Sequence, residues 1–314
     1  MDTHRKPLMK LAPVAPGAGI GVIAAASFAQ PERIERGLAA LTELGFEPKP
    51  APNALARGPL YFAGTPEQRL ADLHAAFEDE STGMVMCLRG GYGSNYLLDG
   101  INVAKITRHP KPFFAYSDLT GIQLRLLDEL GLPAFHGPML AADFYREDGV
   151  HLDSFNSALR GEAYSVGASE GLRTLKAGSA RGVLHGGCLS ILASLVGTRW
   201  EPHTVGALLF LEDVGAKPYQ IDRMLWQLCK AGKLDGVTGI IFGEMLDCVS
   251  PGAAPELLEE AILNALDDFE GPIAIGLRSG HVSRQNVTLT FGVEAELTAS
   301  AQARLEMQGL GTEG

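Results

Sequence analysis

The sequence lacks long apolar runs. No stretch approaches the roughly 20 consecutive apolar residues of a membrane-spanning helix. The N-terminal segment carries basic residues but has no apolar run long enough for a secretory signal peptide. We therefore expect no membrane partner and a cytoplasmic location.

Positive charge is scarce as well. The 314 residues include 26 Lys and Arg against 37 Asp and Glu, which gives a formal net charge of −11. Proteins that bind nucleic acids or anionic membranes usually display a basic surface. The composition therefore predicts no nucleic-acid partner and favours small molecules or neutral polymers.

Cysteine is rare, and its spacing is that of neither a disulfide framework nor a zinc site. The chain has four cysteines and no C-x-x-C pair. Widely spaced cysteines in apolar or helical runs are typical of free buried thiols in a reducing compartment. The eight histidines show no H-E-x-x-H spacing. We expect neither a metal ion nor an organic cofactor.

The first part of the chain alternates between strand and helix patterns. Apolar runs at 20–26, 84–88 and 112–116 predict buried strands, and helices are predicted after Pro31 and after Thr65, which begins a capping-box pattern. This alternation of strands and helices predicts a parallel, Rossmann- or flavodoxin-like sheet with helices on both faces. Ligands of such sheets bind at the carboxyl ends of the strands.

The chain is long enough for two domains. We predict an N-terminal α/β domain over residues 1–145, an irregular polar linker over 146–179, and a smaller mixed α/β domain over 180–314. Strands cluster late in the second domain, and G-V-E-A-E-L (292–297) resembles a hairpin turn and return strand, so we expect a barrel-like sheet. The segment H-G-G-C-L-S (185–190) is predicted to be a loop.

One serine lies where a predicted strand turns directly into a helix, in K-P-F-F-A-Y-S-D-L-T-G (111–121). Ser117 could cap the helix, because its oxygen could accept a hydrogen bond from a free N–H group of the first turn. It could equally be a nucleophile exposed above the carboxyl end of the sheet. The residues alone leave both readings open.

Two other segments offer groups that could act with such a serine. Glu212 and Asp213 directly follow a predicted strand, where they could orient a base, cap a helix or pair with Lys217 or Arg223. His281 lies in a loop between strands, where it could reach across a cleft or be simply solvated. The glycine loop R-G-G-Y-G-S (89–94) lacks the spacing of a nucleotide-binding loop, but its N–H groups could stabilise an oxyanion.

Five segments together resemble the LD-carboxypeptidase family, which also contains the microcin C immunity hydrolases. They are L-R-G-G-Y-G-S (88–94), K-P-F-F-A-Y-S-D-L-T (111–120), F-H-G-P-M (135–139), L-F-L-E-D-V-G-A-K-P-Y-Q-I-D-R-M-L (209–225) and G-H-V-S-R-Q-N-V-T-L-T-F-G (280–292). Order and spacing agree along nearly the whole chain. The resemblance implies a cytoplasmic, dimeric serine peptidase that removes the terminal D-alanine from murein tetrapeptides during cell-wall recycling.

The resemblance also implies site residues. The family's nucleophile corresponds to Ser117, its glutamate to Glu212 and its histidine to His281. The oxyanion donors would be the backbone N–H groups of Gly91 and Asp118.

Substrate identity stays open at this level. A related hydrolase of aminoacyl or peptidyl acyl-adenylate analogues would use the same triad, together with an aromatic ring that stacks on adenine. A non-catalytic anion-binding module or a purely structural protein would need no nucleophile. Four arginines have the charge to bind a terminal carboxylate, although each could instead form a structural ion pair: Arg89, Arg223, Arg278 and Arg284.

Overall fold

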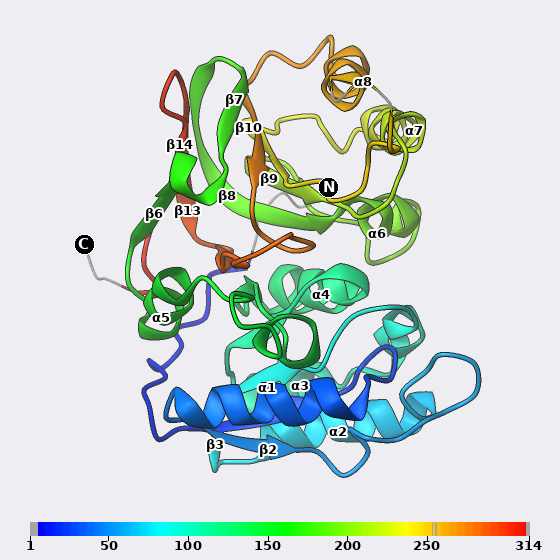
Figure 1. Cartoon of the computed structure of the whole chain (residues 1–314), viewed down its shortest axis with the longest axis vertical. Helices are drawn as coiled ribbons and strands as arrows, with labels where there is room; N and C mark the ends of the chain where they lie inside the picture. The colour runs from blue at the N-terminus through cyan, green and yellow to red at the C-terminus, as the bar shows by residue number, and fades with distance from the viewer. Residues whose placement is uncertain (1–5, 253, 255, 312–314) are drawn as a thin grey trace.

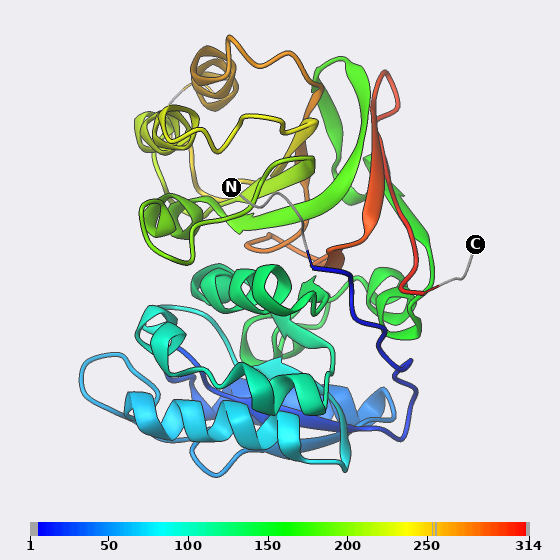
Figure 2. The ribbon, with the colours of Figure 1, turned by 180° about the vertical axis from the view of Figure 1, so that it is seen from behind.

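The structure is a computed structural model that describes residues 6–252, 254 and 256–311, and it contains two β-sheets flanked by helices (Figures 1 and 2). The elements of the first half are β1 (Gly19–Ile23), α1 (Pro31–Glu43), β2 (Glu47–Pro50), α2 (Pro66–Glu78), β3 (Thr82–Cys87), α3 (Val103–Arg108), β4 (Phe113–Ala115), α4 (Thr120–Leu130), β5 (Ala134–His136) and α5 (Leu152–Arg160). No helix in these described ranges is both long and apolar enough to cross a membrane.

The first sheet has the strand order β12-β5-β4-β3-β1-β2. Its five strands from the first half are parallel and follow the flavodoxin-like order 2-1-3-4-5, which confirms the predicted fold class. In such a sheet the ligand site lies where the strand order reverses, at the carboxyl ends of β1 and β3.

Alternation along these strands explains why helices cover both faces. In β3, Met84 and Met86 belong to the core under α1 and α5, whereas Val85 and Cys87 belong to the core under α2, α3 and α4. Because every second side chain is buried on each face, the strands are apolar throughout, as expected for a parallel sheet.

The helix boundaries follow local signals. Thr65 and Gln68 form the predicted capping box of α2, with Thr65 N–H donating to Gln68 Oε1 at 2.9 Å and Gln68 N–H to Thr65 Oγ1 at 3.3 Å. Helix α1 begins at Pro31, and α4 ends at Gly131, whose φ of +73° favours glycine.

The second half forms a mixed sheet with the order β6-β14-β13-β8-β9-β10-β11-β7. Its elements are β6 (Tyr164–Gly167), β7 (Arg173–Lys176), β8 (Gly178–Cys188), α6 (Leu189–Leu195), β9 (Ala207–Glu212), α7 (Pro218–Lys230), β10 (Gly239–Gly243), α8 (Leu257–Ala265), β11 (Ile273–Leu277), β13 (Glu294–Ala299) and β14 (Arg304–Met307), while β12 (Leu289–Phe291) joins the first sheet. Strands β8 to β11 are parallel, and the sheet stays open, because β6 and β7 at its two edges do not pair.

Three expectations for the second half were wrong in detail. The predicted hairpin at 292–297 does not form, because β12 pairs with β5 in the first sheet while β13 pairs with β8 and β14 in the second. The H-G-G-C part of the predicted loop is the end of the long strand β8. The segment 146–179 is not irregular, since it contains α5, β6 and β7. The domain boundaries themselves stay predictions.

Candidate active site

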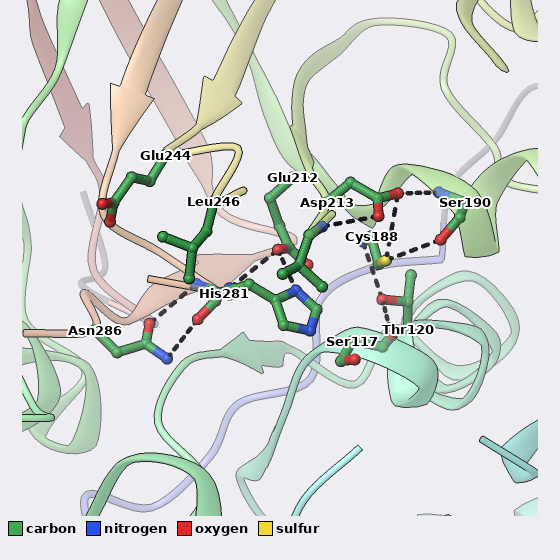
Figure 3. Close-up of polar contacts among 12 residues, drawn as sticks. Ser117, Thr120, Cys188, Ser190, Glu212, Asp213, Glu244, Leu246, His281 and Asn286 are labelled. Atoms are coloured by element: carbon green, nitrogen blue, oxygen red, sulfur yellow. Dashed lines mark hydrogen bonds and ion pairs between the residues drawn. The ribbon is translucent and has the colours of Figure 1, made fainter. Parts of the chain in front are cut away.

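The chain brings three of the predicted side chains to one place. Ser117 follows β4, Glu212 is the last residue of β9, and His281 lies in the loop after β11. Glu212 Oε2 accepts a hydrogen bond from the Nδ1 edge of His281 at 2.7 Å and another from the His281 backbone N–H at 3.0 Å. The other edge of the imidazole points towards Ser117 across the junction of the two sheets (Figure 3).

Glu212 is held in a fully buried slot lined by glycine. A Cβ added at Gly243 would lie 2.7 Å from Glu212 Cβ, and one at Gly280 would lie 2.6 Å from the Glu212 carboxyl carbon. Only glycine therefore leaves room for the carboxylate. The alternative ion pairs of Glu212 with Lys217 or Arg223 do not form.

The neighbouring Asp213 has a different, structural set of contacts. Its carboxylate accepts hydrogen bonds from the backbone N–H groups of Ser190 and Val214, each at 2.8 Å (Figure 3). It therefore ties the start of α6 to the end of β9. Of the two adjacent carboxylates, Glu212 alone contacts His281.

The ion pair sets the protonation of both partners. Burial lowers the pKa of His281, but the charge and hydrogen bond of Glu212 outweigh it, so the pKa is raised above its ordinary value. Burial likewise raises the pKa of Glu212, but His281 outweighs it and the net shift is downward. Glu212 is thus ionised and stabilises a positive charge on His281.

Ser117 does not cap the helix that follows it. Leu119 is the N-cap residue of α4 and makes no side-chain cap, and the Ser117 hydroxyl donates to or accepts from no residue in the described part of the chain. Ser117 has φ of +65°, a left-handed conformation that is rare for a residue with a side chain. The cap interpretation is therefore wrong, and the strained turn exposes the hydroxyl as the strand-to-helix elbows of hydrolases do.

The glycine loop lies so close to this turn that no side chain would fit at Gly90. A Cβ added at Gly90 would lie 2.7 Å from Ser117 Cβ and 3.3 Å from the Asp118 nitrogen. The next residue, Gly91, has φ of +113°, which only glycine adopts readily. Gly91 and the Asp118 N–H thus lie on two adjoining turns beside the serine.

Side chains clamp these two turns together. Asp118 Oδ2 accepts a hydrogen bond from the Ser94 N–H at 2.8 Å, and the Ser94 hydroxyl donates to the Asp118 carbonyl at 2.5 Å. The buried Arg69 donates to the Gly93 carbonyl at 2.8 Å. The loop is therefore fixed relative to the serine before any ligand binds.

A hydrogen-bond cluster behind His281 could not be found from sequence spacing. The Asn286 side chain accepts from the Gly280 N–H at 3.0 Å and donates to the Gly280 carbonyl at 3.1 Å (Figure 3). Asp143 accepts from the Met139 N–H at 2.9 Å, and burial raises its pKa to about 6. It lies in a π-helix, Leu140–Phe144, a form that is frequent at functional sites.

Two aromatic rings lie beside the Glu212–His281 pair. The Tyr116 ring packs edge-on against the His281 ring at 5.2 Å. His136, from the F-H-G-P-M segment, is fully buried between Phe210 and Phe291, and burial lowers its pKa to about 4. His136 is therefore neutral at physiological pH and adds no charge beside Glu212.

A cavity of about 170 Å³ opens over these groups. Ser117, His281, Tyr116, Gly91, Arg33 and Arg89 are among its lining residues. Among the described residues, no three His, Cys, Asp or Glu side chains are grouped so as to hold a metal ion. A hydroxyl, an imidazole–carboxylate pair and backbone donors are the parts that acyl transfer requires.

Comparison with known sequences identifies the family. The LD-carboxypeptidase N-terminal domain matches residues 20–137, and the LD-carboxypeptidase C-terminal domain matches residues 181–297. The chain belongs to the LD-carboxypeptidase family. Within this family member, Ser117 falls in the first matched region, and Glu212 and His281 fall in the second.

Relatives and solved structures agree with this family. The chain is 37% identical to a probable murein peptide carboxypeptidase of Bacillus subtilis over 92% of both proteins. It is 34% identical to the murein tetrapeptide carboxypeptidase of Pseudomonas aeruginosa over 76% of this chain and 79% of the relative. A muramoyltetrapeptide carboxypeptidase from Oxalobacter formigenes superposes with a TM-score of 0.83 at 28% identity, covering 94% of this chain and all of that one. An MccF-like protein from Bacillus anthracis superposes with a TM-score of 0.88 at 25% identity, covering 96% and 99%.

Proposed function

We propose that this family member is a serine LD-carboxypeptidase that removes the terminal D-alanine from murein tetrapeptides. The observation that carries the proposal is the Glu212–His281 pair, whose free imidazole edge faces Ser117, a hydroxyl displayed at positive φ beside a glycine loop. The names of the Bacillus and Pseudomonas relatives support the murein peptide as substrate.

The reaction would proceed by acyl transfer. Ser117 Oγ attacks the carbonyl carbon of the L-centre residue, and His281 takes the serine proton while Glu212 stabilises the imidazolium. The N–H groups of Gly91 and Asp118 stabilise the oxyanion. The C–N bond then breaks, His281 returns the proton to the amine of D-alanine, and water hydrolyses the acyl-enzyme.

The direct experiment is to incubate the protein with murein tetrapeptide and to measure released D-alanine. The Ser117→Ala variant should lose turnover by a factor on the order of 10⁶, because the triad acts as one unit. Ser194→Ala, on the exposed face of α6, is the matched control and should retain activity. D-alanine release by Ser117→Ala at an undiminished rate would remove Ser117 from the mechanism. No release of D-alanine by the wild-type protein would favour a non-catalytic anion-binding module.

A parallel incubation with an aminoacyl sulfamoyl adenylate tests the related hydrolase activity. That activity requires an aromatic surface for the base. Apart from His281, Tyr116 is the only aromatic residue that lines the cavity in the described structure, and its ring is already packed against His281. We therefore expect the tetrapeptide to be the better substrate.

We also propose that the protein acts in the cytoplasm as a homodimer. The family resemblance supports both statements. The four cysteines are free thiols, three of them buried, which suits a reducing compartment.

A further inference from the structure

Two guanidinium groups line the cavity that holds Ser117 and His281. Arg89 lies two residues after the end of β3 and begins the glycine loop, and Arg33 lies in the first turn of α1. A Cβ added at Gly91 would lie 3.4 Å from Nη2 of Arg89. The Arg89 guanidinium therefore lies against the same loop residue whose N–H is proposed to bind the oxyanion.

Arg89 has no partner of its own. It is partly buried, yet its side chain makes no hydrogen bond or ion pair with any residue among 6–252, 254 and 256–311. Other buried or partly buried arginines do: Arg69 donates to two carbonyls, and Arg125 pairs with Glu129. No Arg89 nitrogen is among the fully buried unpaired atoms of the described residues, so its N–H donors remain accessible from the cavity. Five accessible and unused N–H donors beside a serine point to an anionic ligand.

Arg33 is oriented without using its donors. Its guanidinium stacks over the Tyr145 ring, 4.6 Å from the ring centre. Stacking holds the plane of the group and leaves the in-plane N–H bonds available.

The charge of the cavity contrasts with that of the protein. The chain carries a formal net charge of −11, but the residues that line this cavity in the described structure include two arginines and no Asp or Glu. Glu212 lies behind His281, is fully buried and is already paired. An isolated basic cavity in an acidic protein concentrates anions at the serine.

The proposed reaction places an anion at this position. In a peptide that ends at the leaving residue, the free α-carboxylate is separated from the scissile carbonyl carbon only by the amide nitrogen and one α-carbon. A group that binds this carboxylate must therefore adjoin the oxyanion donors, as Arg89 does. An arginine fork binds a carboxylate through two parallel hydrogen bonds.

We infer that Arg89, assisted by Arg33, binds the free α-carboxylate of the leaving D-residue and so restricts the enzyme to the last peptide bond. This inference rests on the proposed function. It also selects among the four arginines that the sequence left open. Arg278 donates to the Ser169 carbonyl at 2.6 Å, and Arg223 stacks on Tyr219. Neither of these two nor Arg284 lines this cavity in the described structure.

The test compares murein tetrapeptide with the same peptide carrying a C-terminal carboxamide. Wild-type protein should prefer the free acid in kcat/KM by a factor on the order of 10². Arg89→Gln should lose a factor on the order of 10² on the acid and change little on the amide, so that the preference disappears. Arg89→Lys should restore part of the preference, because a lysine retains the charge without the fork.

The first helix supplies a matched pair of variants. Arg33 and Arg36 both lie over the Tyr145 ring, at 4.6 and 5.9 Å, but only Arg33 lines the cavity. Arg33→Gln should reduce the preference for the acid by about tenfold, and Arg36→Gln should leave it unchanged. Equal losses on acid and amide in Arg89→Gln would overturn the inference and assign Arg89 to holding the glycine loop.

A binding measurement separates this inference from the proposed function. N-acetyl-D-alanine and its amide are titrated into wild type and Arg89→Gln and followed by NMR. Arg89-dependent preference for the acid in a protein that leaves the tetrapeptide intact would retain the carboxylate site and reject the proposed function. Hydrolysis of the tetrapeptide without any acid preference would reject the site and retain the function.

Discussion

At the scale of single residues, the strained backbone of Ser117 is the feature that most clearly lowers the stability of the fold. A side chain in the left-handed region is unfavourable by about 1–2 kcal/mol relative to the right-handed region. Gly90 and Asp118 pack around the turn and hold it there. The position thus trades stability for exposure of the hydroxyl.

This trade predicts a difference between two inactive variants. Ser117→Gly removes the Cβ that causes the strain, whereas Ser117→Ala retains it. We expect the free energy of unfolding of Ser117→Gly to exceed that of Ser117→Ala by about 1 kcal/mol. Urea unfolding of both variants measures the difference, and a glycine variant less stable than the alanine variant would contradict the strain argument.

The Glu212–His281 pair predicts a shift in the pH profile. Because His281 must be neutral to accept a proton, its raised pKa places the acid limb of kcat/KM above pH ~6.5, the ordinary histidine value. Glu212→Gln removes the two largest contributions that raise the pKa of His281 against the effect of burial, so the pKa falls and the limb moves to lower pH. The rate should also fall by about 10⁴-fold, because the imidazolium loses its carboxylate.

Asp213→Asn is the control for this profile. Asp213 raises the His281 pKa less than Glu212 does, and it makes no hydrogen bond to the ring. Asp213→Asn should therefore shift the acid limb of the pH profile less than Glu212→Gln does. An acid limb that stays in place in Glu212→Gln would show that another group controls the profile.

Sequence could indicate some of these residues but not their neighbours. Ser117 and Glu212 each follow an apolar run directly, and His281 lies in a short polar loop between two predicted strands, so all three positions carry a signal in the sequence. His136 also ends a strand, but its environment could not be predicted, because the Phe210 and Phe291 rings around it come from strands distant in the chain. Asp143 has no such signal. The roles of the first three residues stay predictions.

At the scale of elements, the glycine loop after β3 is the piece that depends most on close packing. Gly90→Ala would bring a Cβ to 2.7 Å from Ser117 Cβ and 2.9 Å from Ser117 Oγ. The loop must then move away from the serine, and a shift of about 1 Å costs on the order of 10² in rate. D-alanine release measures the loss.

Gly83→Ala, on the strand β3 that precedes the loop, is the matched control. A Cβ there would meet Ala18 Cβ at 3.5 Å, an ordinary contact, so activity and stability should stay close to wild type. An active Gly90→Ala enzyme would mean that the contact between loop and serine is not needed.

Elements with local signals could be predicted, and those defined by distant pairing could not. The capping box of α2 and the proline of α1 depend on a few neighbouring residues, and both were predicted correctly. The destination of β12 depends on β5, more than 150 residues earlier, so a local turn pattern suggested a hairpin instead. Short edge strands such as β2 carry too few apolar residues to be recognised.

At the scale of the whole molecule, the two sheets share one apolar core. This core includes Val85 of the first sheet, Ile122 of α4, Leu192 of α6 and Ile240 of the second sheet. Helix α4 contacts both α6 and β8, and it lies between the two halves in both views (Figures 1 and 2). The candidate site lies at this same junction, so the relative placement of Ser117 and His281 depends on the shared core.

The shared core predicts that the two halves unfold together. Hydrogen exchange measured across a urea series should give coincident midpoints for peptides from β1 and β3 and for peptides from β9 and β10. Leu192→Ala, which removes a side chain that is 1% exposed, should destabilise the protein by about 2–5 kcal/mol and shift both sets of midpoints equally. Leu55→Ala, at a side chain that is 66% exposed, should shift neither set. Midpoints that separate, or a Leu192→Ala effect confined to the second half, would show two independent domains and would require another explanation for how the serine and the histidine stay aligned.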